Sequence, residues 1–297
     1  MTDYGHELIF GAFVTPAARP PQQAVELAVA AEEFGLDLVT FQDHPYQPTF
    51  HDAWTLMSYV ASRTSRITVA GNVLNLPLRE PAVLARAVAS LDLLSGGRVE
   101  LGLGAGAFWD AIEAMGGRRL TPGQAVDALA EGIEIIRSVW DTSVKGGVRV
   151  SGEHYTVDGA KRGPAPAHDV SIWVGALKPR MLALTGRLAD GWLPSLAYLK
   201  GGASDLTDMN ARIDAAAVDA GRSPSDVRRL LNVGGSFAAQ SRGFLDGPPD
   251  QWAEELAGLT LEYGTSGFVL ATDDPAAIEL FAKEIAPATR ELVAAER

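Results

Sequence analysis

The chain has 297 residues, of which 47% are hydrophobic and 21% charged, and its formal net charge is −12 at pH 7. An acidic surface repels phosphate backbones and anionic lipids, which argues against nucleic-acid or membrane binding. The absence of cysteine excludes disulfides and thiolate chemistry. The N-terminus, MTDYGHELIF, lacks the basic and apolar regions of a signal peptide, and no run approaches the ~18 apolar residues of a membrane helix, so we expect a soluble, cytoplasmic protein.

Short β-rich runs alternate with helical patterns along the chain, which is typical of parallel βα units. Strands are predicted at residues 8–14, 38–41, 67–74, 99–103, 171–175, 192–194, 230–233 and 267–271. Helices are predicted at residues 22–34, 52–63, 82–94, 122–140 and 179–188, and from about residue 275. This series predicts an α/β fold, a (β/α)8 TIM barrel forming a single domain over residues 1–297. A doubly wound sheet is disfavoured because FGAFVTPA, after the first strand, lacks G-x-G-x-x-G.

Two segments interrupt the alternation of strands and helices. Residues 142–168 are predicted to be an insertion, because VRVSGEHYTV within them alternates like a β-hairpin around Ser151-Gly152. The run Ser195 to Asp208 contains Lys200-Gly201-Gly202 and is expected to be a flexible loop.

The stretch FQDHP places ionisable side chains directly after the second strand. Active sites of such barrels lie at the carboxyl ends of the strands, so Asp43 and His44 stand where catalytic groups are expected. An imidazole titrates near neutral pH and suits acid/base chemistry. A purely structural interpretation, in which Asp43 caps a turn and His44 bonds to backbone, explains the motif about equally well.

Other strand ends carry groups that suit a ligand. Asn72 and Asn75 interrupt the apolar run of the third strand and offer hydrogen-bond donors and acceptors. The fourth strand ends in ELGLGAGAFWD, whose glycines let backbone N–H groups approach a phosphate. After the fifth strand, Gly175 to Lys178 precede Pro179 at a predicted helix start, which favours an anion. Together these loops suggest a phosphate-bearing cofactor whose reactive end lies near His44.

The chain resembles the bacterial luciferase-like monooxygenase family, whose members are flavin-dependent or deazaflavin-dependent barrels. The resemblance rests on the blocks PPQQAVELAVAAEEFGLDLVTFQDHP, REPAVLARAVASLDLLSGGRVELGLGAG and IWVGALKPRMLALTGRLADGW. The Asp-His pair resembles the branch that uses the deazaflavin coenzyme F420, especially its sugar-phosphate and alcohol dehydrogenases. This resemblance implies an oxidoreductase that transfers hydride between F420 and a small organic substrate, and a homodimer.

The resemblance also implies site residues. His44 matches the histidine beside the reactive ring, with Asp43 as the second catalytic candidate, and Asn72-Val73 matches a non-prolyl cis peptide behind the ring. Phosphate binding is implied for the loops at Ala105-Gly106 and Gly175 to Lys178. The expected cofactor-binding residues are Ala12, His44, Asn72, Val73, Gly104, Ala105, Gly106, Gly175, Ala176, Leu177 and Lys178.

The chain departs from the sugar-phosphate dehydrogenases at two positions. Ala107 stands where they have a glutamate, and Thr49 or a neighbour replaces their tryptophan after the histidine. Glucose 6-phosphate is therefore not the expected substrate. The apolar side chains near the expected mouth of the barrel favour a less polar substrate, or else serve packing or a dimer surface; they are Phe13, Phe50, Phe108 and Trp109.

Other functions stay open or are disfavoured by the sequence. The same loops would serve reduced FMN in a two-component monooxygenase, which would need a separate flavin reductase, or a non-catalytic flavin binder. His51 could face the pocket or cap the following helix, whereas His154 and His168 are expected to be structural or solvated, and no pair of these histidines has a convincing metal-ligand spacing. No G-x-S-x-G motif is present, so hydrolysis is disfavoured.

Overall fold

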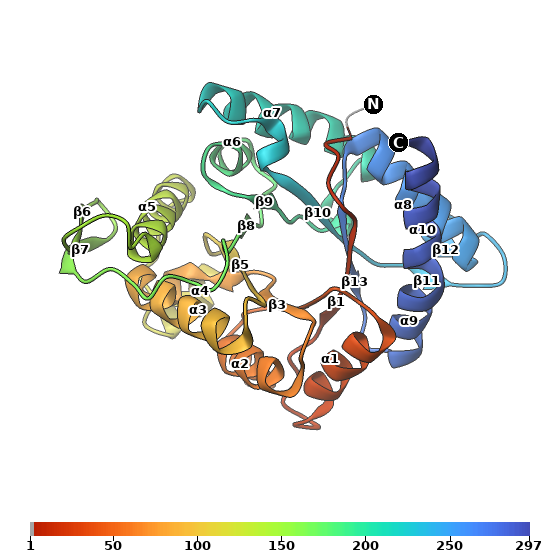
Figure 1. Cartoon of the computed structure of the whole chain (residues 1–297), viewed down its shortest axis with the longest axis horizontal. Coiled ribbons are helices and arrows are strands. Elements are labelled where there is room, and N and C mark those ends of the chain that lie inside the picture. Colours follow the sequence, from red (N-terminus) through yellow and green to blue (C-terminus); the bar gives the residue numbers. More distant parts are fainter. Residues whose placement is uncertain (1–2) are drawn as a thin grey trace.

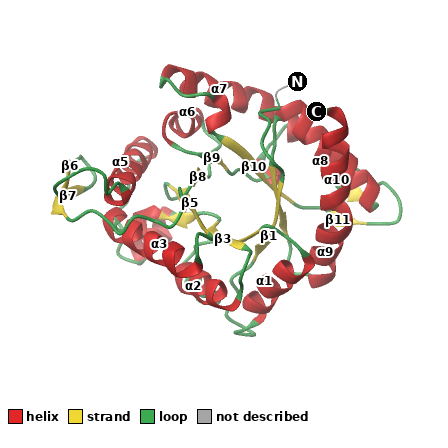
Figure 2. Cartoon of the chain, viewed as in Figure 1, coloured by secondary structure: helices red, strands yellow, loops and turns green. Residues whose placement is uncertain are grey.

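The computed structural model describes residues 3–297 and shows a closed barrel of parallel strands surrounded by helices (Figures 1 and 2). The strand order is β3-β2-β1-β13-β10-β9-β8-β5-β4, and a further β3–β5 pairing closes the ring. The predicted (β/α)8 barrel is thereby confirmed. The barrel strands are β1 (Ile9–Val14), β2 (Leu38–Phe41), β3 (Thr68–Gly71), β4 (Leu74–Asn75), β5 (Val99–Gly104), β8 (Ile172–Val174), β9 (Gly191–Trp192), β10 (Arg228–Val233) and β13 (Gly267–Ala271).

Helices follow the strands and cover the outside of the barrel (Figure 2). Local sequence explains several of their ends: α1 and α3 stop at Gly35 and Gly96, whose φ angles of 106° and 74° suit a residue without a Cβ. The helices are α1 (Gln23–Phe34), α2 (Ala53–Arg63), α3 (Pro81–Ser95), α4 (Trp109–Ala114), α5 (Pro122–Trp140), α6 (Pro179–Leu188), α7 (Asp205–Asp219), α8 (Pro249–Tyr263), α9 (Pro275–Leu280) and α10 (Ala286–Glu296). No helix within residues 3–297 is both long and apolar enough to cross a bilayer.

The segment expected to be a flexible loop, Ser195 to Asp208, is instead largely helical. It folds into two 3-10 turns, η2 (Leu196–Tyr198) and η3 (Gly202–Ser204), and then enters α7. The carboxylate of Asp205 accepts the backbone N–H of Gly201 at 2.9 Å, and Leu206 is buried against the core. The glycines of this segment therefore form turns that lead into a helix, and the prediction of a flexible loop was wrong.

The predicted hairpin is present as β6 (Val148–Ser151) and β7 (Thr156–Ala160), which pair antiparallel outside α5 (Figure 1). The Glu131 carboxylate of α5 accepts the backbone N–H groups of Glu153, His154 and Tyr155 at 2.9–3.0 Å. These bonds fix the turn of the hairpin to the barrel's outer helix layer. The assignment of the whole chain to one domain stays a prediction.

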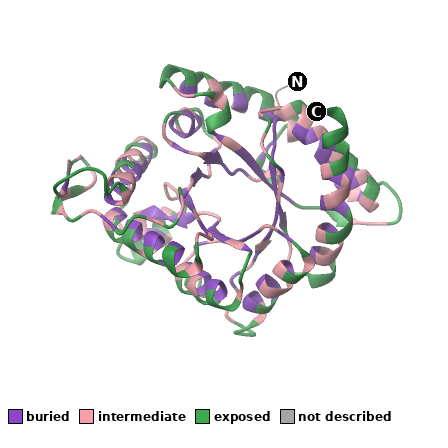
Figure 3. Cartoon of the chain, viewed as in Figure 1, coloured by how far each residue is buried: buried purple, intermediate pink, exposed green. Residues whose placement is uncertain are grey.

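Side chains alternate between two hydrophobic layers. The inner layer fills the barrel and is built from Leu38, Ala70, Trp173, Leu193, Leu230 and Val269. The outer layer lies between the strands and the helices, so on β2 the side chains of Val39 and Phe41 pack there while Leu38 points inward. Figure 3 shows the result as buried strands and helices buried on their inner sides.

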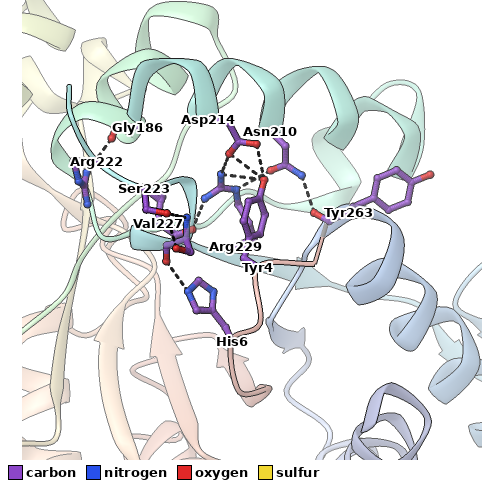
Figure 4. A network of polar contacts seen from close by, with 11 residues as sticks. Tyr4, His6, Gly186, Asn210, Asp214, Arg222, Ser223, Val227, Arg229 and Tyr263 are labelled. Atoms are coloured by element: carbon purple, nitrogen blue, oxygen red, sulfur yellow. Dashed lines mark hydrogen bonds and ion pairs between the residues drawn. The ribbon is translucent and has the colours of Figure 1, made fainter. Parts of the chain in front are cut away.

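A polar network closes the end of the barrel where β10 begins (Figure 4). The guanidinium of Arg229 is 1% exposed and donates to Asn210 at 2.8 Å and to Asp214 at 2.5 Å. It also lies over the Tyr4 ring at 4.5 Å, and the Tyr4 hydroxyl donates to Asp214 at 2.8 Å. Burial raises the pKa of Tyr4 to about 12. This network ties the N-terminal segment to β10 and α7 at the end opposite the strand termini that carry Asp43 and His44.

A buried carboxylate of α3 organises the segment that leads into β8. Asp92 of α3 is fully buried and accepts the backbone N–H groups of Val99, Ala167 and His168 at 2.7–3.2 Å. Its carboxylate also lies 3.0 Å from Nδ1 of His168, whose Nε2 is 3.6 Å from Glu100. The Glu100 carboxylate is the main cause that raises the pKa of His168 to about 9; burial opposes this effect, and Asp92 adds to it.

The His168 ion pair predicts a pH-dependent stability. Because the folded state raises the pKa of His168 from 6.5 to about 9, its contribution is fully present below pH 6.5 and is lost as the pH rises towards 9. We expect urea denaturation to show the free energy of unfolding falling across this range, and the fall to be smaller in His168→Gln. Burial is the main cause that lowers the pKa values of His6 and His44, so both side chains titrate below this pH range. An equal fall in the variant would contradict the assignment.

Candidate active site

A cavity of about 650 Å³ opens at the carboxyl ends of the strands and is lined by the ends of β1, β4, β5 and β10 and by the loops that follow β2, β3, β5, β8 and β9. Nearly all residues that the sequence predicts for the site line this cavity: Asp43, His44, Asn72, Val73, Gly104, Ala105, Gly106, Gly175, Ala176, Leu177 and Lys178. The exception is Ala12, which is fully buried in the outer hydrophobic layer. Its neighbour Phe13 lines the cavity instead.

His44 is half-buried in the wall of the cavity. Its ring stacks on Tyr46 with centroids 5.4 Å apart and meets the edge of Phe108 at 5.3 Å. Burial lowers the pKa of His44 below its ordinary value of 6.5, and the charge of Asp43 acts in the opposite direction without cancelling the shift. The imidazole is therefore neutral at pH 7 and has one ring nitrogen free to accept a proton.

Asp43 is buried behind His44 and is bound to a residue that the sequence analysis did not single out. Both of its carboxylate oxygens accept from Arg79, Oδ2 from Nε and Oδ1 from Nη2, each at 2.9 Å. Oδ2 also accepts the backbone N–H of Asn75 at 2.9 Å. Within residues 3–297 no hydrogen bond joins Asp43 to His44, so Asp43 acts on the imidazole through its charge and through the backbone.

The third predicted strand is interrupted at Asn72-Val73, where the peptide bond is cis as the resemblance implies. The side-chain amides of Asn72 and Asn232 form a reciprocal pair at 2.7 and 3.1 Å, and Asn232 also donates to the Ser195 hydroxyl at 3.1 Å. Asn232 and Ser195 line the cavity and were missed from the sequence. An asparagine that interrupts the apolar end of the strand RRLLNV was the available signal for Asn232.

The loop after β8 offers a positive charge and a helix start. Lys178 is exposed at the N-cap of α6, lines the cavity and forms no ion pair with any residue in 3–297. No side chain among the described residues 3–297 caps this helix N-terminus, and Pro179 occupies its first turn. The backbone N–H groups of the first turn and the Lys178 ammonium together favour an anion at this edge of the cavity.

Aromatic side chains line the cavity, but only two of the four apolar side chains that the sequence places near the mouth of the barrel are among them. Phe13 and Phe108 line the cavity, whereas Phe50 and Trp109 do not. Two residues that the sequence analysis did not weigh, Tyr46 and Tyr198, line it as well, and Tyr198 is 72% exposed. The space next to His44 is therefore bounded mainly by rings and apolar groups.

The three other histidines that the sequence analysis considered, His51, His154 and His168, lie outside this cavity. Nε2 of His51 is 3.0 Å from the Pro21 carbonyl oxygen, and His168 belongs to the Asp92 ion pair. His154 lies in the turn of the hairpin, where its backbone N–H is bound by Glu131. His51 therefore does not face the cavity, and the positions of His154 and His168 agree with their structural interpretation.

Sequence comparison finds several relatives that carry the same protein name. The F420-dependent glucose-6-phosphate dehydrogenase of Kribbella flavida is 33% identical over 226 residues, 73% of this chain and 65% of that protein. The protein of the same name from Amycolatopsis mediterranei is 36% identical over 180 residues, 58% of this chain and 53% of that protein. The chain thus spans less than two thirds of these two relatives. The one from Microbacterium testaceum is 29% identical over 300 residues, 92% of this chain and 87% of that protein.

Solved structures agree with the fold. An F420-dependent secondary alcohol dehydrogenase in complex with an F420-acetone adduct superposes with a TM-score of 0.84 at 20% identity, covering 96% of this chain and 99% of that one. A long-chain alkane monooxygenase superposes with a TM-score of 0.79 at 15% identity, covering 96% and 92%. At these identities the likeness concerns the fold. The family model described as luciferase-like monooxygenase matches residues 8–242, and the chain therefore belongs to the luciferase-like monooxygenase family.

Proposed function

We propose that this protein is an oxidoreductase that transfers hydride between coenzyme F420 and a small organic substrate. The observation that carries the proposal is the half-buried imidazole of His44 in the wall of a cavity that is also lined by loops suited to a phosphate-bearing coenzyme. The relatives named F420-dependent glucose-6-phosphate dehydrogenase support the choice of coenzyme.

The residues of the cavity fit such a coenzyme in their chemistry. Val73, Leu193 and Ala176 give apolar surface for a flat ring system, and the Asn72–Asn232 amide pair adds donors and acceptors. Lys178 and the first turn of α6 suit the phosphate of its side chain. When bound, the deazaflavin supplies or accepts the hydride; the protein orients it, excludes water and handles the accompanying proton.

His44 is the proposed acid/base group, because it is neutral at pH 7 and half-buried at the cavity. In the direction that oxidises an alcohol, it takes the hydroxyl proton while hydride leaves the carbon; in the opposite direction it returns that proton. Asp43 does not touch the cavity's ligand in this proposal. It influences His44 through its charge, which is held by Arg79.

The substrate proposed for this site is smaller and less charged than a sugar phosphate. Lys178 is the only lysine or arginine among the described residues that line the cavity, and it is assigned above to the coenzyme phosphate. Tyr46 and Phe108 lie against His44, and Ala107 provides no carboxylate at the position that resembles a glutamate. A hydroxyl or carbonyl group facing His44 with an apolar body against these rings fits this arrangement.

Coenzyme titration tests the proposal most directly. We expect the purified protein to bind F420 in calorimetric or fluorescence titrations at least about 10-fold more tightly than oxidised or reduced FMN, measured without oxygen. Preference for reduced FMN, with oxygen consumption, would instead identify a two-component monooxygenase and require a reductase partner. Tight binding of F420 without turnover of any alcohol, ketone or activated alkene would indicate a non-catalytic binder. The homodimer and the cytoplasmic location stay predictions.

Replacement of His44 tests its role. His44→Ala should lower kcat by about 10²-fold or more, because general acid–base catalysis contributes on that scale, while the Kd for F420 changes only a few-fold. The matched control is His51→Ala, since His51 lies outside the cavity and bonds to the Pro21 carbonyl oxygen. Equal turnover in His44→Ala and the parent protein would exclude His44 as the acid/base group.

The pKa of His44 predicts the shape of the pH profile. Because burial lowers this pKa below 6.5, the imidazole stays able to accept a proton throughout the neutral range. In the direction that reduces F420, kcat/KM should fall only as the pH drops through the lowered pKa, so the acid limb lies below pH 6.5. An acid limb above pH 6.5 would contradict a neutral His44.

A further inference from the structure

His44 lies on the segment that connects β2 to α2, residues 42–52, here called the His44 loop. Asp43 stands at its start and Asp52 at its end. Asp52 is also the N-cap of α2, where its Oδ1 accepts the backbone N–H and the hydroxyl of Thr55 at 2.8 Å. The two ends of the loop therefore each carry a carboxylate next to a fixed element, a barrel strand on one side and a helix on the other.

One guanidinium binds both carboxylates. Arg79 lies between η1 (Leu76–Leu78) and α3, and its side chain is 18% exposed. Nε and Nη2 bind the fully buried carboxylate of Asp43 at 2.9 Å, and Nη2 also lies 3.1 Å from Oδ2 of Asp52. This fork geometry is specific to arginine, because lysine offers a point charge without two parallel donors.

We propose that Arg79 is a positioning residue for His44: its guanidinium holds the two ends of the His44 loop together and compensates the charge of Asp43, which fixes the imidazole in the wall of the cavity. The inference rests on the proposed function for its catalytic consequence. Its structural part, the effect of Arg79 on His44, is measurable in the protein without coenzyme.

The electrostatic part follows from the groups that face His44. These are Asp43 and Tyr46 from its own loop and Lys178 from the loop after β8, which lines the same cavity. Among them the charge of Asp43 acts to raise the pKa of His44 and is outweighed by burial. Without Arg79 the Asp43 carboxylate would keep only the Asn75 N–H, and its uncompensated charge would act fully on the neighbouring imidazole.

The mechanical part follows from the hydrogen bonds. Burial alone would lower the pKa of Arg79. The hydrogen bonds and charges of Asp43 and Asp52 outweigh burial and raise this pKa, so the guanidinium is held as a cation. A permanently charged group that binds two carboxylates restricts both ends of the loop at once. The ring of His44 between Tyr46 and Phe108 then has a defined place relative to the cavity.

The test combines two substitutions with a matched control. Arg79→Met removes the charge and keeps an apolar side chain, Arg79→Lys keeps the charge and loses the fork, and Arg149→Met removes an exposed arginine that pairs with Asp158 in the hairpin. For each protein, NMR of the imidazole nitrogens gives the titration midpoint of His44 without coenzyme. The His44 signal is assigned by its loss in His44→Gln, since the chain has 5 histidines. Turnover and F420 affinity are measured in parallel.

In Arg79→Met we expect the His44 midpoint to rise by about one pH unit and kcat to fall about 10-fold or more, with F420 affinity changed only a few-fold. Arg79→Lys should keep the midpoint near that of the parent protein but lower kcat, and Arg149→Met should change neither. An unchanged midpoint and kcat in Arg79→Met would overturn the inference, as would equal changes in Arg149→Met. If the protein does not bind F420, the proposed function is wrong, but the effect of Arg79 on His44 is still tested, because the titration midpoint of His44 is measured without coenzyme.

If Arg79→Met does not fold, Asp52→Asn provides the second variant. Asparagine caps a helix as well as aspartate does, so α2 keeps its N-cap while the contact between Arg79 and the end of the loop loses its charge. We expect the His44 midpoint to stay unchanged and kcat to fall. An unaltered kcat in both Asp52→Asn and Arg79→Lys would refute the proposed restraint of the loop.

Discussion

The packing of Val73 inside the barrel is the constraint on which the site depends. Its side chain belongs to the inner layer and lies where β3 ends, between β5 and β8. A Cβ added to Gly104 would lie 2.7 Å from Val73, and one added to Gly175 would lie 3.3 Å from it. A side chain at Gly104 would therefore force Val73 to shift, and one at Gly175 would require Val73 to move by a few tenths of an ångström. The same glycines begin the loops that line the cavity, so one buried valine links the packing of the barrel to the shape of the site.

Both ends of the barrel pair a guanidinium with carboxylates, but the consequences differ. Arg229 binds Asp214 and Asn210 beneath the Tyr4 ring, which fills the closed end of the barrel. Arg79 binds Asp43 at the open end, directly behind a titratable ring that faces the cavity. Removing one partner of a buried ion pair costs far more than forming the pair gains, so such pairs specify a geometry more than they add stability. At one end this geometry serves the fold, and at the other it serves His44.

Much of the fold was predictable because its signals are local. Alternating strand and helix patterns predicted the barrel, and polar groups at strand ends predicted His44, Asn72 and Lys178 as cavity residues. Ala12 does not line the cavity, and the sequence could not show this because the strand IFGAFV is apolar throughout, so nothing in it shows which side chains point inward. Arg79, Asn232 and Ser195 were missed because their roles come from partners 36 to 160 positions away in the chain. Such pairings exist only once the barrel has closed.

Closure of the barrel has a consequence for how the protein is made. β1 pairs in parallel with β13, Ile9 opposite Gly267, so the first strand receives its second neighbour only after almost the entire chain has been synthesised. Until then β1 presents an unpaired apolar edge, which is the kind of surface that drives intermolecular strand pairing. A chain that stops short of residue 267 therefore leaves the sheet open at β1, and the edge that β13 covers in the closed barrel is then exposed to pairing with another molecule.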